Sequence, residues 1–290
     1  MPAQGRTVRG CAGDPMNKLP KTYSRLVDAN GLKSLVLIDG AMQQRLGANL
    51  AGQPEGAVSL FVEYPKAARA LGPWLMSERR AAALGIDGCA RGINWIASEQ
   101  PMAAIEAHLV LWMRGQDRDA RCWHRLADGR ALNALLSVWT VAQQHAFSHP
   151  LRAWCYADRN GAGHLLSLAH RFEILTPVSP ALEPEQQVAL NRATLADALI
   201  HELKTLTPLH ASVKVCREQR HAAVDAVLTQ AMATGYGDMK DLAALTAWAL
   251  RTGTEASRRV AELPALQQQL SGNALIQALH RDTRDAEVGP

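Results

Sequence analysis

The stretch from Ile93 to Leu135 constrains the fold most, because helix periodicity, capping residues and turn residues agree along it. Residues 93–98 are almost continuously apolar and predict a short, buried strand. Pro101 suits the first turn of a helix, where an amide would have no intrahelical partner. The helix predicted after it has one apolar stripe, made by Met102, Ile105, Leu109 and Trp112. Gly115 is the expected C-terminal cap of this helix. Because its apolar residues lie on one face, the helix is expected to pack that face on a sheet.

A second strand and helix are predicted directly after this helix. Cys122, His124 and Leu126 alternate with Arg121, Trp123 and Arg125, which is the period of a strand. Asp128 is the expected N-cap of a helix that continues to Leu136. The stretch therefore predicts strand, helix, strand and helix in succession.

The same signals divide the rest of the chain up to residue 176. Strands are predicted at residues 35–38, 57–62, 72–76, 151–156 and 165–174. Helices are predicted at residues 18–33, 42–50, 65–71, 78–84 and 137–148. The turn pair Asn30-Gly31 is expected to end the first of them, and Ser77 is the expected N-cap of the fourth. Asp158 to Gly161 has the composition of a hairpin turn.

From Glu185 onward only helices are predicted. Helical stripes run from Val188 to Leu206, over residues 217–234 and over 239–252, and Pro264 divides the last helical stretch. The predicted fold class is α/β, a mixed-sheet N-terminal lobe with flanking helices, plus an all-α C-terminal lobe. The expected divisions are a basic, partly disordered segment 1–33, an α/β domain 34–176, a proline-rich linker 177–184, a helical lobe 185–280 and a frayed tail 281–290.

Composition and charge exclude several classes of protein. The 290 residues are 48% hydrophobic, and none of the apolar runs reaches the roughly 20 residues of a membrane span. The five cysteines are widely spaced without a Cys-x-x-Cys pair, so neither a disulfide framework nor a zinc site is expected. Six of the 31 Lys and Arg but two of the 27 Asp and Glu lie in residues 1–33, which leaves a neutral body. A cytoplasmic protein that binds neither nucleic acid nor membrane is expected; Met16 is a second candidate start.

No catalytic set stands out in the sequence. Asp39 ends a buried strand, where an acid can be a phosphotransfer nucleophile or a metal ligand, but helix capping is the favoured interpretation. His145 and His149 have the spacing of two metal ligands on one helix face, without an evident third ligand. The Gly-rich segments at 161–163 and 235–237 lack the strand-before, helix-after setting of a dinucleotide loop. The protein is therefore expected to use no cofactor or metal and not to be an enzyme.

Tryptophan is unusually frequent, with seven residues against three phenylalanines. Trp123 and Trp154 are predicted to share strand faces with arginines, which makes a mixed aromatic and arginine surface typical of a partner-binding site. The candidate partner-binding residues are Arg121, Trp123, Arg125, Arg152 and Trp154.

Several motifs, taken in order, resemble those of the adaptor-chaperones of bacterial type VI secretion. The motifs are Ile38-Asp39-Gly40-Ala41, Ser59-Leu60-Phe61, Gly72-Pro73-Trp74-Leu75, Trp95 to Ser98, Ala107-His108-Leu109 and Arg125 to Arg130. The resemblance covers roughly Leu35 to Gly161, and in the C-terminal part Tyr236-Gly237, Asp241-Leu242 and Ala249 to Gly253 resemble the helical lobe of such proteins. The positions carried over are Asp39, Gly40, Trp74, Trp95, Ser98, Asp128 and Arg130. The family usually has a proline where this chain has Gly129 and an aromatic residue where it has Ala127.

The resemblance implies a binding function. Such proteins recognise the N-terminal region of a toxic effector and load it onto the VgrG spike or its PAAR tip, and they have no known catalytic residues to carry over. The expectation is an adaptor whose two lobes form a cleft for the effector, with apolar contacts and an arginine-aromatic rim. The alternatives are a hydrolase or phosphotransferase that uses Asp39 with Asp128 as the second acid, and a structural subunit that assembles with itself.

Overall fold

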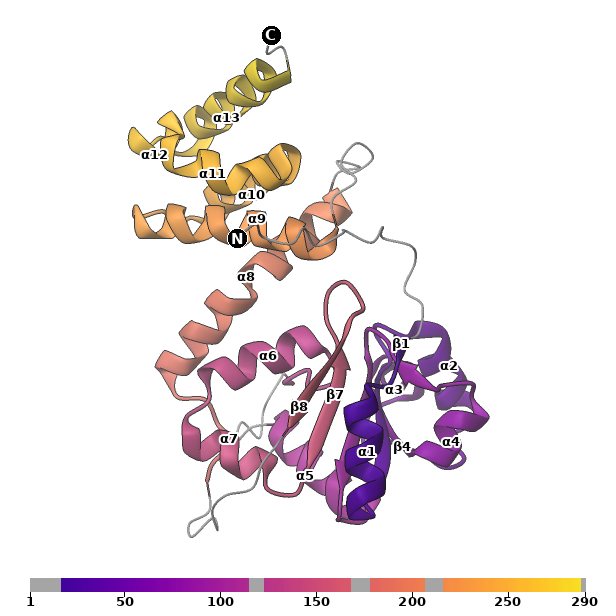
Figure 1. The fold of residues 1–290 in the computed structure, drawn as a ribbon. Coiled ribbons are helices and arrows are strands. Elements are labelled where there is room, and N and C mark those ends of the chain that lie inside the picture. The colour runs from indigo at the N-terminus through magenta and orange to yellow at the C-terminus, as the bar shows by residue number, and fades with distance from the viewer. Residues whose placement is uncertain (1–16, 115–122, 168–177, 207–215, 288–290) are drawn as a thin grey trace, which may run out of the picture. The chain divides into compact units, whose positions relative to one another are not determined.

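The computed structural model describes residues 17–114, 123–167, 178–206 and 216–287 (Figure 1). These residues form two compact units, one that ends at Leu190 and one that begins at Asn191. Helix α8 (Pro184–Leu206) contributes residues to both units.

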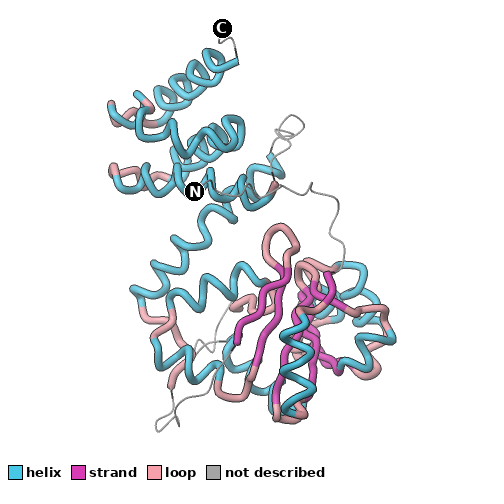
Figure 2. The backbone as a smooth tube through the Cα atoms, in the orientation of Figure 1, coloured by secondary structure: helices cyan, strands magenta, loops and turns pink. Residues whose placement is uncertain are grey.

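A six-stranded sheet is the frame of the N-terminal unit (Figure 2). The strand order is β3-β4-β2-β6-β7-β8, and every neighbouring pair is antiparallel. The strands are β2 (Lys33–Asp39), β3 (Ala57–Ser59), β4 (Pro73–Ser77), β6 (Ile93–Ser98), β7 (Ala153–Ala157) and β8 (Gly163–Ser167). Two shorter strands, β1 (Asn17–Lys18) and β5 (Gly88–Cys89), pair with each other. The predicted fold class, a sheet lobe with flanking helices followed by a helical lobe, is confirmed, although the sheet is antiparallel and not mixed.

Helices cover both faces of the sheet, which explains why its central strands are apolar at successive positions (Figure 1). Val36 and Ile38 of β2 enter the core on one face, and Leu35 and Leu37 enter the core on the other. The helices on the first face are α1 (Lys21–Asn30), α2 (Gln44–Gly52) and α4 (Glu78–Ala83). The helices on the second face are α5 (Met102–Arg114), α6 (Gly129–Val138) and α7 (Val141–Ser148). A further short helix, α3 (Lys66–Leu71), precedes β4.

The helix ends follow the local signals in the sequence. Gly31 caps α1 in the left-handed conformation, with φ of 58°. The Ser77 hydroxyl accepts a hydrogen bond from the Arg80 amide at the start of α4, at 3.3 Å. The Asp128 carboxylate accepts one from the Arg130 amide at the start of α6, at 3.1 Å. Capping residues therefore located three of these ends correctly.

Three predicted elements of this unit are wrong. The strand predicted at 57–62 stops at Ser59, because the backbone then turns and the Ser59 hydroxyl accepts a hydrogen bond from the Phe61 amide. The predicted strand 121–126 is a loop and turn from Trp123 onward, and Arg121 and Cys122 lie outside the described residues. The predicted helix 137–148 starts at the wrong residue: α6 continues to Val138, and a capping box between Thr140 and Gln143 starts α7 at Val141.

Two further boundaries differ from the prediction. The strand predicted at 165–174 begins earlier, at Gly163, and residues 168–177 lie outside the described residues. The tail predicted to fray from residue 281 continues as helix to Glu287. An amphipathic stripe that contains the buried Leu275 and Leu279 carries this helix beyond the expected end.

The C-terminal unit is entirely helical in its described residues. Its core joins residues of α8, α9 and α10, with Val227, Leu245 and Trp248 among those buried. The Tyr236 hydroxyl is shared between the carbonyl oxygens of Ala265 and Leu270, which holds the loop after α9 against the last helices. The elements are α9 (Arg217–Ala233), α10 (Met239–Thr252), η1 (Gly253–Glu255), α11 (Ala256–Arg259), η2 (Val260–Glu262), α12 (Pro264–Gln267) and α13 (Gly272–Glu287). Within the ranges that the structure describes, none of the helices has the length and hydropathy needed to cross a membrane.

Trp154 tests the packing of the sheet, because its side chain is 0% exposed and its indole N–H donates to Asn94. We expect Trp154→Ala to lower the free energy of unfolding by about 3–5 kcal/mol, the usual cost of removing a buried large aromatic side chain. Urea denaturation followed by circular dichroism measures this loss. The matched change Val141→Ala, at a side chain that is 68% exposed, should cost about 0.5 kcal/mol or less. A loss below about 1 kcal/mol for Trp154→Ala would contradict this packing.

Candidate partner-binding site

Two carboxylates meet one guanidinium at the end of the sheet where β2 finishes. Asp39 is paired in register with Pro73 of β4, and its amide donates to the Gly92 carbonyl before β6. One oxygen of its carboxylate accepts from the Met42 amide at 3.0 Å, and the other accepts from Arg125 Nη2 at 2.7 Å. Asp39 therefore fastens the turn after β2 and the distant loop that holds Arg125, instead of capping α2 as predicted; α2 begins later, at Gln44.

Asp128 lies on the other side of the same guanidinium. Its carboxylate accepts two hydrogen bonds from the Arg130 side chain, at 2.9 and 2.6 Å, and lies 3.5 Å from Arg125 Nη1. Burial raises the pKa of Asp128, but the hydrogen bonds and charge of Arg130 and the charge of Arg125 outweigh burial and hold that pKa below its usual range. Arg125 thus bridges two buried carboxylates from distant parts of the chain. We call Asp39, Arg125, Asp128 and Arg130 the carboxylate clasp.

Asn94 joins the clasp loop to the centre of the sheet. Its side-chain amide donates to the Ala127 carbonyl at 2.7 Å, and its oxygen accepts from the Trp154 indole at 3.1 Å. The residue is 1% exposed, so these bonds satisfy a polar group that would otherwise be costly to bury. Sequence reasoning missed Asn94, although an amide inside the apolar run 93–98 is a usable signal.

Three aromatic side chains form a cluster beside the clasp loop. The Trp123 ring lies 4.7 Å from Phe61 and 5.9 Å from Tyr64, measured between ring centroids, and Phe61 lies 5.1 Å from Tyr64. The Trp123 indole N–H donates to the Tyr64 hydroxyl at 3.1 Å. Tyr64 is 37% exposed, and Val62 within the same turn is 65% exposed. We call Phe61, Tyr64 and Trp123 the aromatic cluster.

One arginine lies over the aromatic cluster. The Arg114 guanidinium is 5.2 Å from the centroid of the Trp123 ring, within the range of a cation–π contact. Arg114 also pairs with Glu63 at 2.8 Å, and both side chains are well exposed. Exposed pairs of this kind contribute only about 0.2–1 kcal/mol, so they orient the surface more than they stabilise the fold. An aromatic and arginine surface therefore exists, with Arg114 in place of the arginines predicted from the sequence.

Residues of the sequence motifs position Phe61 through close backbone contacts. A Cβ on Gly72 would lie 2.5 Å from the Phe61 ring, so only glycine lets the ring pack there. The Leu60 amide donates to the Pro73 carbonyl at 2.9 Å, which anchors the turn that carries Phe61. The Gly40 amide donates to the Gly72 carbonyl at 3.0 Å, and a Cβ on Gly40 would lie 2.7 Å from that oxygen. These close contacts fix Phe61, while the clasp fixes the segment that carries Trp123.

The structure separates the five partner-binding residues predicted from the sequence. Trp123 is partly exposed within the aromatic cluster, and Arg125 belongs to the clasp. Arg152 forms an exposed ion pair with Glu99 at 2.6 Å. Trp154 is fully buried, so the prediction that it lies on a surface is wrong: both faces of β7 are covered, and alternation cannot mark an exposed face there. Arg121 lies outside the described residues.

The remaining positions carried over from the resemblance are buried and support the fold. Trp74 donates its indole N–H to the Arg69 carbonyl, and Trp95 donates to the Gly88 carbonyl, both at 2.9 Å. The Ser98 hydroxyl donates to the Pro150 carbonyl and accepts from the Gln100 amide. His108, which belongs to one of the motifs but is not a carried-over position, is partly buried and donates to the Phe147 carbonyl. Burial lowers its pKa to about 4, so the imidazole is neutral at neutral pH. Each side chain ties one strand or helix to a neighbouring segment.

The acidic side chains of this site are buried and engaged by arginines. No group of three or more His, Cys, Asp and Glu side chains converges as a metal site in the part of the chain that the structure describes. Asp39 and Asp128, the two acids of the alternative enzyme hypothesis, are 5% and 3% exposed, and arginines engage both carboxylates. What the site offers to solvent is the aromatic cluster with Arg114.

The clasp predicts a pH-dependent stability. Asp128→Asn keeps a capping side chain but removes the charge, and we expect it to cost about 1–3 kcal/mol at pH 7. Since the folded pKa of Asp128 lies below the ordinary 3.8, its carboxylate stabilises the fold fully above that pH and loses the effect as pH falls through the folded pKa. The difference in unfolding free energy between wild type and variant should therefore shrink below about pH 4. Urea titrations at several pH values measure it, and a difference that stays constant to pH 3 would contradict the clasp.

Comparison with known proteins gives one family match, and it covers the part of the chain that holds this site. Residues 35–146, less than half of the chain, match the family model described as a domain of unknown function (DUF4123). Neither a curated protein nor a solved structure matches the chain. The matched span contains the whole carboxylate clasp and the whole aromatic cluster, and the description of the family model names no function.

Proposed function

We propose that this protein is a cytoplasmic adaptor-chaperone that binds a type VI secretion effector and aids its loading onto the VgrG spike or its PAAR tip. It acts by non-covalent protein binding and has no enzymatic activity. The ordered motifs that resemble such adaptors and the match to a domain of unknown function over residues 35–146 support the proposal.

The observation that carries the proposal is the aromatic cluster with Arg114 on the surface of the matched domain. Tryptophan, tyrosine and arginine are the residues most enriched at the centres of protein interfaces, and the aromatic rings bury large areas there. Here their rings are already held in place by one another and by the glycine contact beneath Phe61. A preorganised surface loses less entropy when a partner binds.

Polypeptide contact suits this surface better than bond-making chemistry. Asp39, the nucleophile of the enzyme hypothesis, is almost completely buried, and both of its carboxylate oxygens accept hydrogen bonds. The cluster instead presents apolar rings and Val62 beside one guanidinium and one carboxylate. An apolar segment of the effector's N-terminal region would fit the rings. A carboxylate next to that segment would pair with Arg114 in place of Glu63. Binding would cover an apolar segment that otherwise aggregates.

Replacement of one ring tests the proposal. The protein is co-expressed with the neighbouring toxin and spike genes, affinity-purified, and its partners are identified by mass spectrometry. With the captured effector, we expect Trp123→Ala to raise the dissociation constant at least about 30-fold. This factor corresponds to about 2 kcal/mol, the size of an interface hot spot. Arg114→Ala should weaken binding by a smaller factor, because its contact is exposed.

Val141→Ala serves as the control, because it removes an exposed apolar side chain of α7 at 68% exposure outside the cluster. Its affinity should equal that of wild type, and circular dichroism should show all variants folded. The proposal fails if no effector is captured, or if Trp123→Ala binds like wild type. Stable self-assembly without any captured partner would instead favour a structural subunit.

A further inference from the structure

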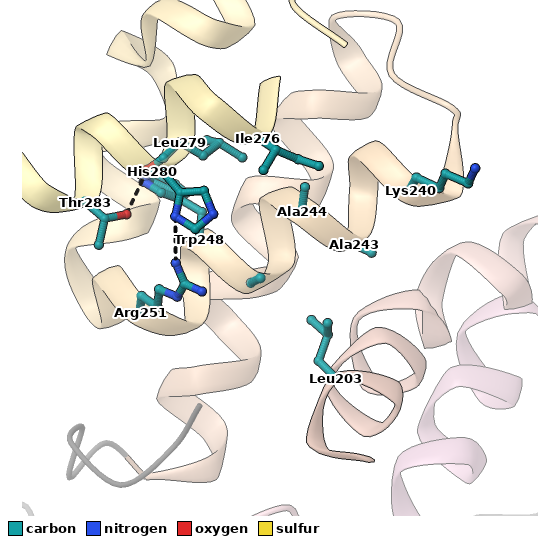
Figure 3. Close-up of a pocket in the computed structure, with 11 residues that line it drawn as sticks. Leu203, Lys240, Ala243, Ala244, Trp248, Arg251, Ile276, Leu279, His280 and Thr283 are labelled. Carbon is teal, nitrogen blue, oxygen red and sulfur yellow. Dashed lines mark hydrogen bonds between the residues drawn. The ribbon is translucent and has the colours of Figure 1, made fainter. Parts of the chain in front are cut away.

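The helical unit contains an apolar groove of its own, outside the matched domain (Figure 3). Its volume is about 260 Å³, and it is lined by residues of α10 and α13 together with Leu203 of α8. That volume lies just below the roughly 300–1,000 Å³ of typical small-molecule sites. The groove therefore has room for a few apolar side chains and not for a large cofactor.

A single stripe of α10 forms one side of the groove. Lys240, Ala244, Ala247 and Arg251 follow one another at spacings of four, three and four residues, so they share one helix face. At about 1.5 Å per residue, the separation of eleven positions between the two cations corresponds to roughly 16 Å along the helix. The two small alanines allow another chain to approach the middle of the stripe closely. The two long cations attract negative charge at its ends.

Few hydrogen-bonding groups face the groove. The Thr283 hydroxyl donates to the Leu279 carbonyl, and the Trp248 indole N–H donates to Asp282 at 2.7 Å. Trp248 is held further by Arg259, whose guanidinium lies 5.9 Å from its ring centroid. Ile276 is 40% exposed on α13 and extends the apolar surface. The walls are thus preformed and apolar, without the converging polar groups that orient a small ligand.

The positive charge at the ends of the stripe is not balanced by the described carboxylates of α10 and α13. Asp241 accepts from the Gly272 amide at 2.8 Å, and Asp282 pairs with Arg259 at 2.6 Å. Arg251 Nη1 lies 3.3 Å from His280 Nδ1, and no ion pair to Lys240 or Arg251 occurs among the described residues. A partner with carboxylates at matching positions would complement both ends.

We propose that this groove binds one amphipathic helix of a partner protein, with leucine-like residues on one face and two carboxylates about three turns apart. Amphipathic helices bind apolar grooves through anchors repeated every three or four residues, which is the spacing that α10 presents. The alanines let the partner helix lie close to α10, while its carboxylates reach Lys240 and Arg251. The inference rests on the adaptor function only for the source of the helix, and it gives the protein a second binding surface in its other unit.

The test uses the full-length protein and two synthetic helical peptides. Both carry leucines on one face and two charged residues eleven positions apart, which are glutamates in one peptide and lysines in the other. Fluorescence anisotropy of the labelled peptides should show micromolar binding of the glutamate peptide and at least tenfold weaker binding of the lysine peptide. Salt should weaken the stronger complex, because its charged ends are exposed.

Charge reversal and groove blocking provide the decisive variants. The double variant Lys240→Glu and Arg251→Glu should reverse the preference, so that the lysine peptide binds better. Ile276→Glu should weaken the glutamate peptide at least tenfold. The matched variant Met232→Glu changes an apolar side chain of α9 that is 38% exposed and does not line the groove, so it should bind like wild type. Circular dichroism confirms folding of each variant.

The inference is overturned if wild type binds neither peptide, if both peptides bind equally, or if the double variant keeps the wild-type preference. These outcomes are separate from those of the adaptor function. Trp123→Ala should leave peptide binding unchanged, so loss of the effector with retained peptide binding would remove only the adaptor proposal. Capture of the effector without peptide binding would remove only the groove.

Discussion

The interaction on which the N-terminal unit depends is the bridge that Arg125 makes between Asp39 and Asp128. Each carboxylate is almost fully buried, and a buried carboxylate without a partner is costly. One guanidinium, helped by Arg130, satisfies both and so joins the end of β2 to the start of α6. Arg125 is itself half-exposed, which keeps its own desolvation modest. The clasp therefore fixes two segments of the domain that are far apart in sequence.

The carboxylate clasp also positions part of the aromatic cluster. Trp123 precedes Arg125 by two residues, so the loop that the clasp anchors also delivers the indole to Phe61 and Tyr64. Phe61 is positioned independently by the close contact with Gly72. Most of the motif positions are buried supports, whereas Tyr64, Trp123 and Arg114 lie outside the motifs and are exposed or partly exposed. The motifs thus contribute Phe61 to the aromatic cluster and otherwise position side chains that lie next to them.

The sequence was informative where the signal is local. The caps Gly31, Ser77 and Asp128 and the apolar strand at 93–98 predicted elements that the structure contains. It failed where three-dimensional packing decides: Trp154 alternates with Arg152, yet helices cover both faces of β7. The cluster joins residues about sixty positions apart, and no spacing rule connects Phe61 with Trp123. The bridge that Arg125 makes between two distant carboxylates likewise cannot be found before the strands are aligned.

The proposal that this protein binds an effector through a preorganised surface is tested most directly by mapping which residues the effector protects in the complex. Hydrogen–deuterium exchange, read by mass spectrometry, would compare the free protein with the complex it forms with its captured effector. The account predicts slower exchange at residues 60–64 and 123–126 in the complex, with the core strand β2 unchanged. Protection confined to other parts of the N-terminal unit, with residues 60–64 and 123–126 exchanging as in the free protein, would contradict it.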